Sequence, residues 1–186
     1  MGRIVGYRRA ERAVAGPVTK FGGQPVWLQV PRWPLSAAWG TPMRFVAQIS
    51  INDQKEEKLA YLFVTAADDD DFDPDVIFPD GGENAVIIQP GGAYDGPAVE
   101  QATGPTVCDE EYLVDEDDAA DDQDDDRIGR GEPVTLREEP AGGPWRLLLR
   151  LATNWTPFRL NLGAAPLLFA LIDADGQRGC MLVEDS

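Results

Sequence analysis

Short apolar segments separated by turn residues run through most of this 186-residue chain. Runs of five to nine residues rich in Val, Ile, Leu and Phe, bounded by Gly, Pro, Asp or Asn, are typical of β-strands. Helical periodicity is weak, and only 7–14 and 54–59 could form a turn or two of helix. The pattern predicts a mainly β single domain of antiparallel sheets over 1–186, with a β-rich α+β fold as the alternative. The expected strands cover 4–7, 26–30, 43–51, 59–65, 85–89, 134–137, 145–152, 159–162, 166–173 and 179–183.

Two of these segments resemble each other. MRFVAQI at 43–49 and WRLLLRL at 145–151 share an apolar-Arg-apolar start, and each precedes a strand that contains a Phe. A Gly-Gly pair also precedes each copy, at 22–23 and 142–143. We interpret the similarity as an internal duplication, the alternative being a chance likeness between two β-hairpins. The duplication predicts that both hairpins pair in the same order, with Phe63 and Phe169 at equivalent buried positions.

Acidic residues are concentrated in one part of the chain. The formal charge is −17, and the window 68–126 holds 22 acidic residues and no Lys or Arg. Its longest run, 109–126, holds 12 of them and is interpreted as an acidic, flexible insertion, a long loop within the domain. The alternative is a surface that binds a basic protein, since such a segment repels the phosphates of nucleic acids. The candidate partner-binding acids are Asp115, Glu116, Asp117, Asp118, Asp124, Asp125 and Asp126.

The first acidic run has part of the spacing of a calcium-binding EF-hand loop. Asp69, Asp71, Asp73 and Asp80 fall at positions 1, 3, 5 and 12 of such a loop. Position 6 is Pro74, whose fixed φ cannot make the sharp turn that glycine makes there. An EF-hand is therefore not expected, and these four carboxylates remain candidates only for an irregular cation site. We expect no cofactor.

Catalytic residue types are scarce. The chain has no His and only two Cys, Cys108 and Cys180, which excludes His-based triads and Cys- or His-ligated structural zinc. Esterase, P-loop and dinucleotide-binding motifs do not occur. Carboxylates remain, and a cation-dependent or carboxylate-based hydrolase is the alternative function. The longest uncharged apolar stretch, 160–172, is too short to span a membrane, and the N-terminus does not resemble a signal peptide.

The motif KFGGQPVWL at 20–28 is followed by Trp33-Pro34 and by GTPMRFVAQI at 40–49. This series resembles the YwqG-like family of uncharacterised bacterial proteins and, more distantly, the programmed cell death protein 2 family. The resemblance implies a mostly β, internally duplicated domain and carries over no catalytic residues. The latter relatives look like chaperones for a basic ribosomal protein, and some YwqG-like genes lie near toxin systems. This chain departs from the programmed cell death protein 2 family by lacking Cys-based zinc positions.

The tryptophans of this motif suggest a core and a surface role. Trp27 follows a Gly-Gly turn and a Pro and is expected in the core, as is Trp145. Trp33 and Trp39 lie between Pro and Gly residues, so one of them is expected to stay partly exposed. Trp33 and Trp39 are therefore candidates for an aromatic groove that binds an extended peptide.

Together these features predict a non-enzymatic protein-binding module in a bacterial cytoplasm. Its acidic face would bind a basic protein partner, in an immunity-type or chaperone-like role. Neither nucleic acid nor membrane is expected as a partner. The excess of Arg over Lys, 13 to 3, together with abundant Ala, Gly and Pro, suggests a GC-rich genome.

Overall fold

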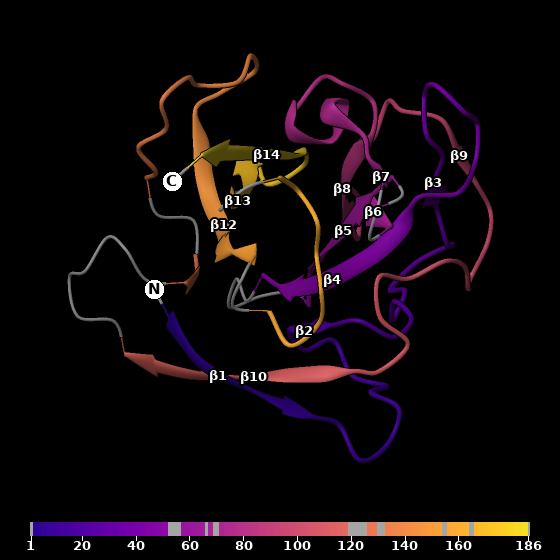
Figure 1. Cartoon of the computed structure of the whole chain (residues 1–186), viewed down its shortest axis with the longest axis vertical. Coiled ribbons are helices and arrows are strands. Elements are labelled where there is room, and N and C mark those ends of the chain that lie inside the picture. The colour runs from indigo at the N-terminus through magenta and orange to yellow at the C-terminus, as the bar shows by residue number, and fades with distance from the viewer. Residues whose placement is uncertain are drawn as a thin grey trace.

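The computed structural model describes residues 2–51, 57–65, 67–68, 71–118, 126–129, 133–153, 156–163 and 166–185, and its fold is mainly β (Figure 1). Within these residues, one antiparallel sheet has ten strands, and two small sheets have two strands each. The same residues contain no helix long and apolar enough to cross a membrane. The elements are β1 (Gly2–Arg9), β2 (Lys20–Phe21), β3 (Trp33–Pro34), β4 (Arg44–Ser50), β5 (Leu59–Val64), β6 (Ala67–Asp68), β7 (Asp71–Phe72), the 3-10 helix η1 (Pro74–Ile77), β8 (Asn84–Gln89), β9 (Ala98–Val99), β10 (Tyr112–Asp118), β11 (Arg127–Ile128), β12 (Trp145–Ala152), β13 (Pro166–Asp173) and β14 (Gly179–Asp185).

The order of strands in the large sheet shows the duplication. We call β1, β2, β4, β5 and β8 the first half, and β10 to β14 the second half. The sheet order is β14-β13-β12-β11-β1-β10-β2-β4-β5-β8, so corresponding strands stand at equal distances from the centre. The first strands of the halves are exchanged, because β1 pairs with β11 and β10 pairs with β2. In Figure 1, β1 and β10 lie together along the bottom of the view and join the two halves.

Both halves have a β-bulge at the same place, which aligns them residue by residue. The pairing of β4 with β5 shifts by one residue at Val46, and that of β12 with β13 shifts at Leu148. Each bulge carbonyl accepts a hydrogen bond from a glycine, Gly22 N at 2.8 Å and Gly129 N at 2.9 Å. The expected pairing order of the hairpins is thus confirmed. Gly22 corresponds to Gly129, however, and not to the Gly-Gly pair at 142–143.

The expected match between Phe63 and Phe169 is wrong by two residues. Phe63 pairs with Phe45 and corresponds to Leu171, which pairs with Leu147. Phe169 corresponds instead to Tyr61. Both phenylalanines are buried as expected, because a shift of two residues keeps a side chain on the same face of a strand. Face and burial follow from the alternation of the sequence, whereas position is set by pairing register.

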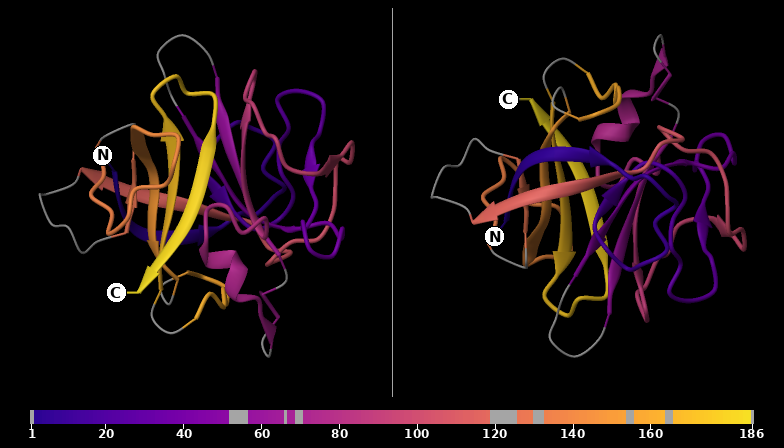
Figure 2. Two further views of the ribbon diagram at one scale, coloured as in Figure 1. Left: turned by 90° about the horizontal axis from the view of Figure 1, so that it is seen from above. Right: turned by 90° about the horizontal axis from the view of Figure 1, so that it is seen from below.

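The main core lies between the two halves. Figure 2 shows the strands of the second half facing those of the first, and one apolar cluster contains inward residues of both, such as Leu62 and Ala170. The end strands β8 and β14 also meet, since a Cβ at Gly179 would collide with Val86. Alternate residues of the same strands point outward and form a second apolar layer on each half.

Three expected strands are not strands. Segments 26–30 and 134–137 cross the outer faces of the two halves, and 159–162 adds Leu160 and Leu162 to the core between them. Most of their apolar residues are partly or fully buried, as the alternation indicated, although Val30 is 61% exposed. In 26–30 and 134–137, side chains such as Gln48, Tyr61 and Glu184 bond to the backbone in place of a neighbouring strand. The spacing of apolar residues indicates which side chains are buried, but it does not show whether a neighbouring strand is available for pairing.

Candidate binding surface

The acidic stretch contains a strand at the centre of the sheet. Tyr112–Asp118 forms β10, which corrects the expectation that all of 109–126 is a loop. Its neighbour β1 carries three arginines, and Arg3 stands opposite Asp117 in the register. Arg8 Nε lies 3.7 Å from Asp115 Oδ1. Cross-strand pairs of opposite charge offset the repulsion among neighbouring carboxylates, so an acidic segment can be a strand here.

The predicted acids of this stretch have different surroundings. Asp115, Glu116 and Asp117 are exposed on β10, and Asp118 ends that strand. Asp126 is half-buried, and its Oδ1 accepts a hydrogen bond from Ala152 N at 2.6 Å, which makes it part of the sheet framework. Asp124 and Asp125 lie outside the described residues.

The two candidate tryptophans differ in exposure. Trp33 is fully buried, and its Nε1 donates to Met43 O at 2.7 Å, so it cannot contact a partner at the surface. Trp39 is 71% exposed and remains available. Trp145 is in the core as expected, whereas Trp27 is only partly buried and packs against Tyr61 with ring centroids 4.6 Å apart.

The four candidate cation ligands do not form a described site. Asp69 lies outside the described residues, and only the backbone of Asp71 is described, in β7. Asp73 Oδ1 accepts a hydrogen bond from Asp75 N at 3.0 Å and caps η1. Asp80 is exposed. Among the side chains that the structure describes, no three potential ligands gather around a possible metal position.

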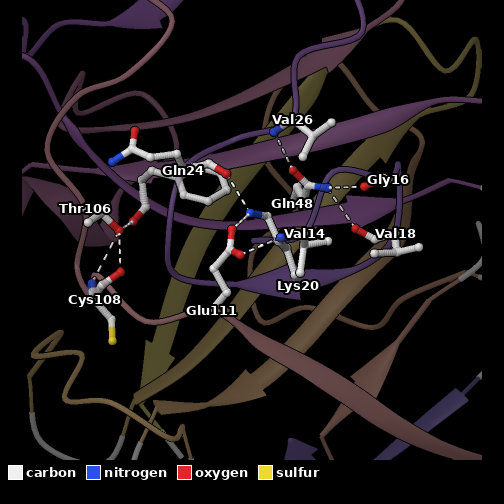
Figure 3. Close-up of polar contacts among 11 residues, drawn as sticks. Val14, Gly16, Val18, Lys20, Gln24, Val26, Gln48, Thr106, Cys108 and Glu111 are labelled. Carbon is white, nitrogen blue, oxygen red and sulfur yellow. Dashed lines mark hydrogen bonds and ion pairs between the residues drawn. The ribbon is translucent and has the colours of Figure 1, made fainter. Parts of the chain in front are cut away.

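A buried ion pair joins β2 to the residue that precedes the exchanged strand β10 (Figure 3). Lys20 of β2 is fully buried, and its ammonium pairs with the Glu111 carboxylate and donates to Gln24 O at 2.6 Å. Glu111 also accepts a hydrogen bond from Val14 N at 2.7 Å. Because Lys20 belongs to the first half and Glu111 directly precedes β10, the pair holds the two halves together. No substrate could reach this ammonium without unfolding around it.

A buried amide organises the same loops. Gln48 Oε1 accepts from Val26 N at 2.9 Å, and its Nε2 donates to Val18 O at 2.9 Å (Figure 3). Gln24 pairs with Gly104 through both its amide oxygen and its amide nitrogen. These side chains replace strand pairing for the segments that lie around β2.

The outer apolar layers of the halves consist of corresponding residues. Met43, Phe45, Tyr61, Phe63, Ala85 and Ile87 in the first half match Trp145, Leu147, Phe169, Leu171, Cys180 and Leu182 in the second, by pairing register. In the first half this layer is covered by Trp27, Leu28 and Trp33. In the second half, Val134 and Leu136 pack against part of the layer.

A groove of about 710 Å³ lies beside the part of the second half's outer layer that contains Trp145, Cys180 and Leu182. Its apolar side chains include Phe78, which is 50% exposed, together with Tyr94, Trp145, Cys180 and Leu182. Burial, with the nearby Asp80 charge, raises the pKa of the Cys180 thiol to about 12, so this thiol is protonated and unreactive at neutral pH. The groove therefore offers an apolar surface without an activated nucleophile at Cys180.

Charged residues surround this groove. Five acidic and two basic residues line it: Asp80, Asp95, Glu138, Glu139, Glu184, Arg137 and Arg178. One cation is engaged within the chain, since Arg178 Nη2 lies 3.5 Å from Asp95 Oδ2. The groove thus combines an apolar interior with an acidic rim.

Sequence reasoning missed the groove, although a short repeat could have indicated it. Pro133-Val-Thr-Leu-Arg137 repeats Pro25-Val-Trp-Leu-Gln29, and both segments cross an outer sheet face. The repeat is offset from the Gly-Gly pairs and therefore escapes an alignment that starts from them. Comparison with known proteins adds no relative, since no family model, curated protein or solved structure gave a significant match.

Proposed function

We propose that this protein is a non-enzymatic binding module that engages a basic protein through its acidic surface. The observation that carries the proposal is the exposure of Asp115, Glu116 and Asp117 on the central strand β10. Their neighbour β1 contributes only three arginines, whereas 109–126 contains 12 acidic residues. Negative charge therefore exceeds the positive charge beside it.

Such a surface acts mainly on association. Exposed charges attract a basic partner over roughly a Debye length, about 8 to 10 Å near physiological ionic strength, and raise the association rate. β10 pairs with β1 along its length, including at the three acids, and with β2 at Tyr112 and Leu113. A preformed surface loses little conformational entropy on binding.

We also propose that the chain is a divergent bacterial member of the YwqG-like family. The supporting features are the KFGGQPVWL motif and the duplicated β architecture that the resemblance implies. An immunity-type or chaperone-like role in the cytoplasm fits a module that masks a basic surface.

Affinity capture from native lysate with matched variants tests the proposal. One variant carries Asp115→Asn, Glu116→Gln and Asp117→Asn, and the control removes the same charge from exposed Glu57, Glu100 and Asp175. We expect wild type and control to retain a basic protein that the β10 variant loses, chiefly through slower association that added salt reproduces. The melting temperature should change little, because the loss of exposed pairs with Arg3 and Arg8 is offset by the relief of repulsion between neighbouring carboxylates. Equal capture by both variants, or an acidic partner, contradicts the proposal.

A further inference from the structure

The two halves bury the same outer layer in different ways, and the first half shows what such a layer accommodates. There, the irregular segment 26–33, which bends at 28–30, lies across the sheet and places Trp27 and Trp33 on Phe63, with ring centroids 6.2 and 5.2 Å away. Side chains of the sheet hold its backbone. Tyr61 Oη accepts from Leu28 N at 3.0 Å and donates to Val26 O at 2.8 Å.

Gln89 at the sheet edge continues this binding of backbone. Its Oε1 accepts from Gln29 N at 3.0 Å, and its Nε2 donates to Val30 O at 2.9 Å. The first half therefore binds a segment without regular secondary structure, through aromatic side chains and through polar side chains that bond to its main chain. This is a mode of peptide recognition carried out within the molecule.

The second half has a shorter cover of the same kind. Glu184, which corresponds to Gln89, accepts a hydrogen bond from Arg137 N at 2.8 Å. Thr135 stands where Trp27 stands in the first repeat. Fourteen positions separate Gln29 from Met43, but only eight separate Arg137 from Trp145. The second half thus lacks the length of chain that carries Trp33 in the first, and the groove adjoins Trp145 there.

The groove differs in charge from the corresponding cavity of the first half. In the first half a smaller cavity of about 560 Å³ is lined by Gln29, Val30, Ile87 and Gln89, with Arg32 as the one charged lining residue among those described. The corresponding residues of the groove are Arg137, Glu138, Leu182 and Glu184. Glu138 and its neighbour Glu139 are exposed at the rim. An occupant of the groove must therefore match an acidic rim as well as an apolar interior.

From this contrast we propose that the groove binds an extended peptide segment of the partner, in which a bulky apolar side chain is flanked by Lys or Arg. The apolar side chain enters beside Trp145 and Leu182, and the cationic residues pair with Glu138 and Glu139. The groove volume of about 710 Å³ lies within the roughly 300–1,000 Å³ common for ligand sites. The inference rests on the proposed function and names the part of the basic partner that is recognised.

Selection from a display library of random linear peptides, followed by binding measurements on the synthetic winners, tests this proposal. We expect winners in which Trp, Phe or Leu is flanked by Lys or Arg. Glu138→Lys with Glu139→Lys should weaken their binding about tenfold or more, since like charges then meet at the rim. The matched control, Glu57→Lys with Glu100→Lys, makes the same charge change at two exposed carboxylates that do not line the groove, and should change affinity by less than about threefold.

Three outcomes would show that the groove is not the peptide-binding site. These outcomes are failure to select any peptide, winners without basic residues, and equal or larger losses of affinity in the control variant. Melting curves of both variants exclude unfolding as the cause, and amide chemical shifts at Gly179 and Cys180 should move on peptide binding. If the captured basic protein depends on β10 but not on Glu138 and Glu139, the proposed function stands and the groove proposal fails. If no basic protein is captured, the proposed function itself fails.

Discussion

The two halves of this molecule share one strand pattern and differ in what covers its outer face. Both have five corresponding strands, a bulge at Val46 or Leu148 and six matching outward residues. The first half seals that layer with Trp27 and Trp33. In the second half, the shorter segment 133–137 covers part of the layer, and an acidic groove lies beside the layer. The comparison teaches that the framework is maintained by pairing, while the covering segments are free to become either core or binding surface.

The strongest test of this contrast is removal of the cover of the first half. Trp33→Ala deletes a fully buried indole together with its hydrogen bond to Met43 O, and should lower the free energy of unfolding by about 5 kcal/mol. Trp39→Ala, in the same segment but 71% exposed, should change it by less than about 0.5 kcal/mol. Urea denaturation measures both. Similar losses in the two variants would show that the cover is not part of the core.

A second test concerns the junction where the halves exchange strands. Lys20→Met removes the cation of this buried ion pair and leaves the Glu111 carboxylate without it. The substitution should lower the free energy of unfolding by about 3 to 4 kcal/mol. Adding Glu111→Leu removes the unpaired carboxylate and should recover a large part of that loss. Denaturant titration of both variants decides this point. If the double variant is as unstable as the single one, the charge of the pair is not what joins β2 to β10.

A third test compares the two residues that hold the covering segments. Gln89→Ala removes two hydrogen bonds from a buried amide, and should cost about 1 to 3 kcal/mol. Glu184→Ala removes one bond at a partly exposed site, and should cost about 0.5 to 1 kcal/mol. Hydrogen exchange of Gln29 N and Arg137 N locates each effect. A larger loss at Glu184 would reverse the contrast between a sealed and an open half.

The last test, whose effect near neutral pH is the smallest, distinguishes Cys180 from Ala85, its counterpart in the first half. Burial raises the pKa of Cys180 to about 12 in the folded protein, whereas the unfolded thiol ionises near 9. The unfolded state therefore releases a proton first, and the free energy of unfolding should fall as pH rises from about 9 to about 12. In Cys180→Ala this part of the decline should vanish. Identical pH profiles for both proteins would show that Cys180 is not shielded from water.

Several features were predictable because they depend on local sequence. Leu59–Val64 and Trp145–Ala152 alternate or run continuously apolar, and both are strands. Gly22 and Gly23 have φ of 70° and 65°, as expected for a turn, although the segment 26–30 that follows is not a strand. The likeness of 43–49 to 145–151 correctly indicated equal pairing order.

The candidate site was less predictable, for physical reasons that particular residues show. Trp33 has a Pro next to it and looks like a loop residue, yet the outer layer of the first half buries it completely. Glu138 belongs to no motif, and it shares a groove with Trp145 only because β12 and the segment after Pro133 meet there. Contacts of this kind join residues across the fold, and no local periodicity encodes them.

By itself, the sequence determined the β class, the alternation that buries residues such as Phe63 and Phe169, and the repeated hairpin. Those properties follow from side-chain size and from the two-residue period of a strand. Only the tertiary structure decided that acidic Tyr112–Asp118 is a central strand, that the halves exchange their first strands, and that one outer face is sealed while the other keeps a groove. These outcomes depend on which distant segment supplies a hydrogen-bonding edge or, for the acidic strand β10, the opposite charges. Neither is encoded within the strand's own sequence.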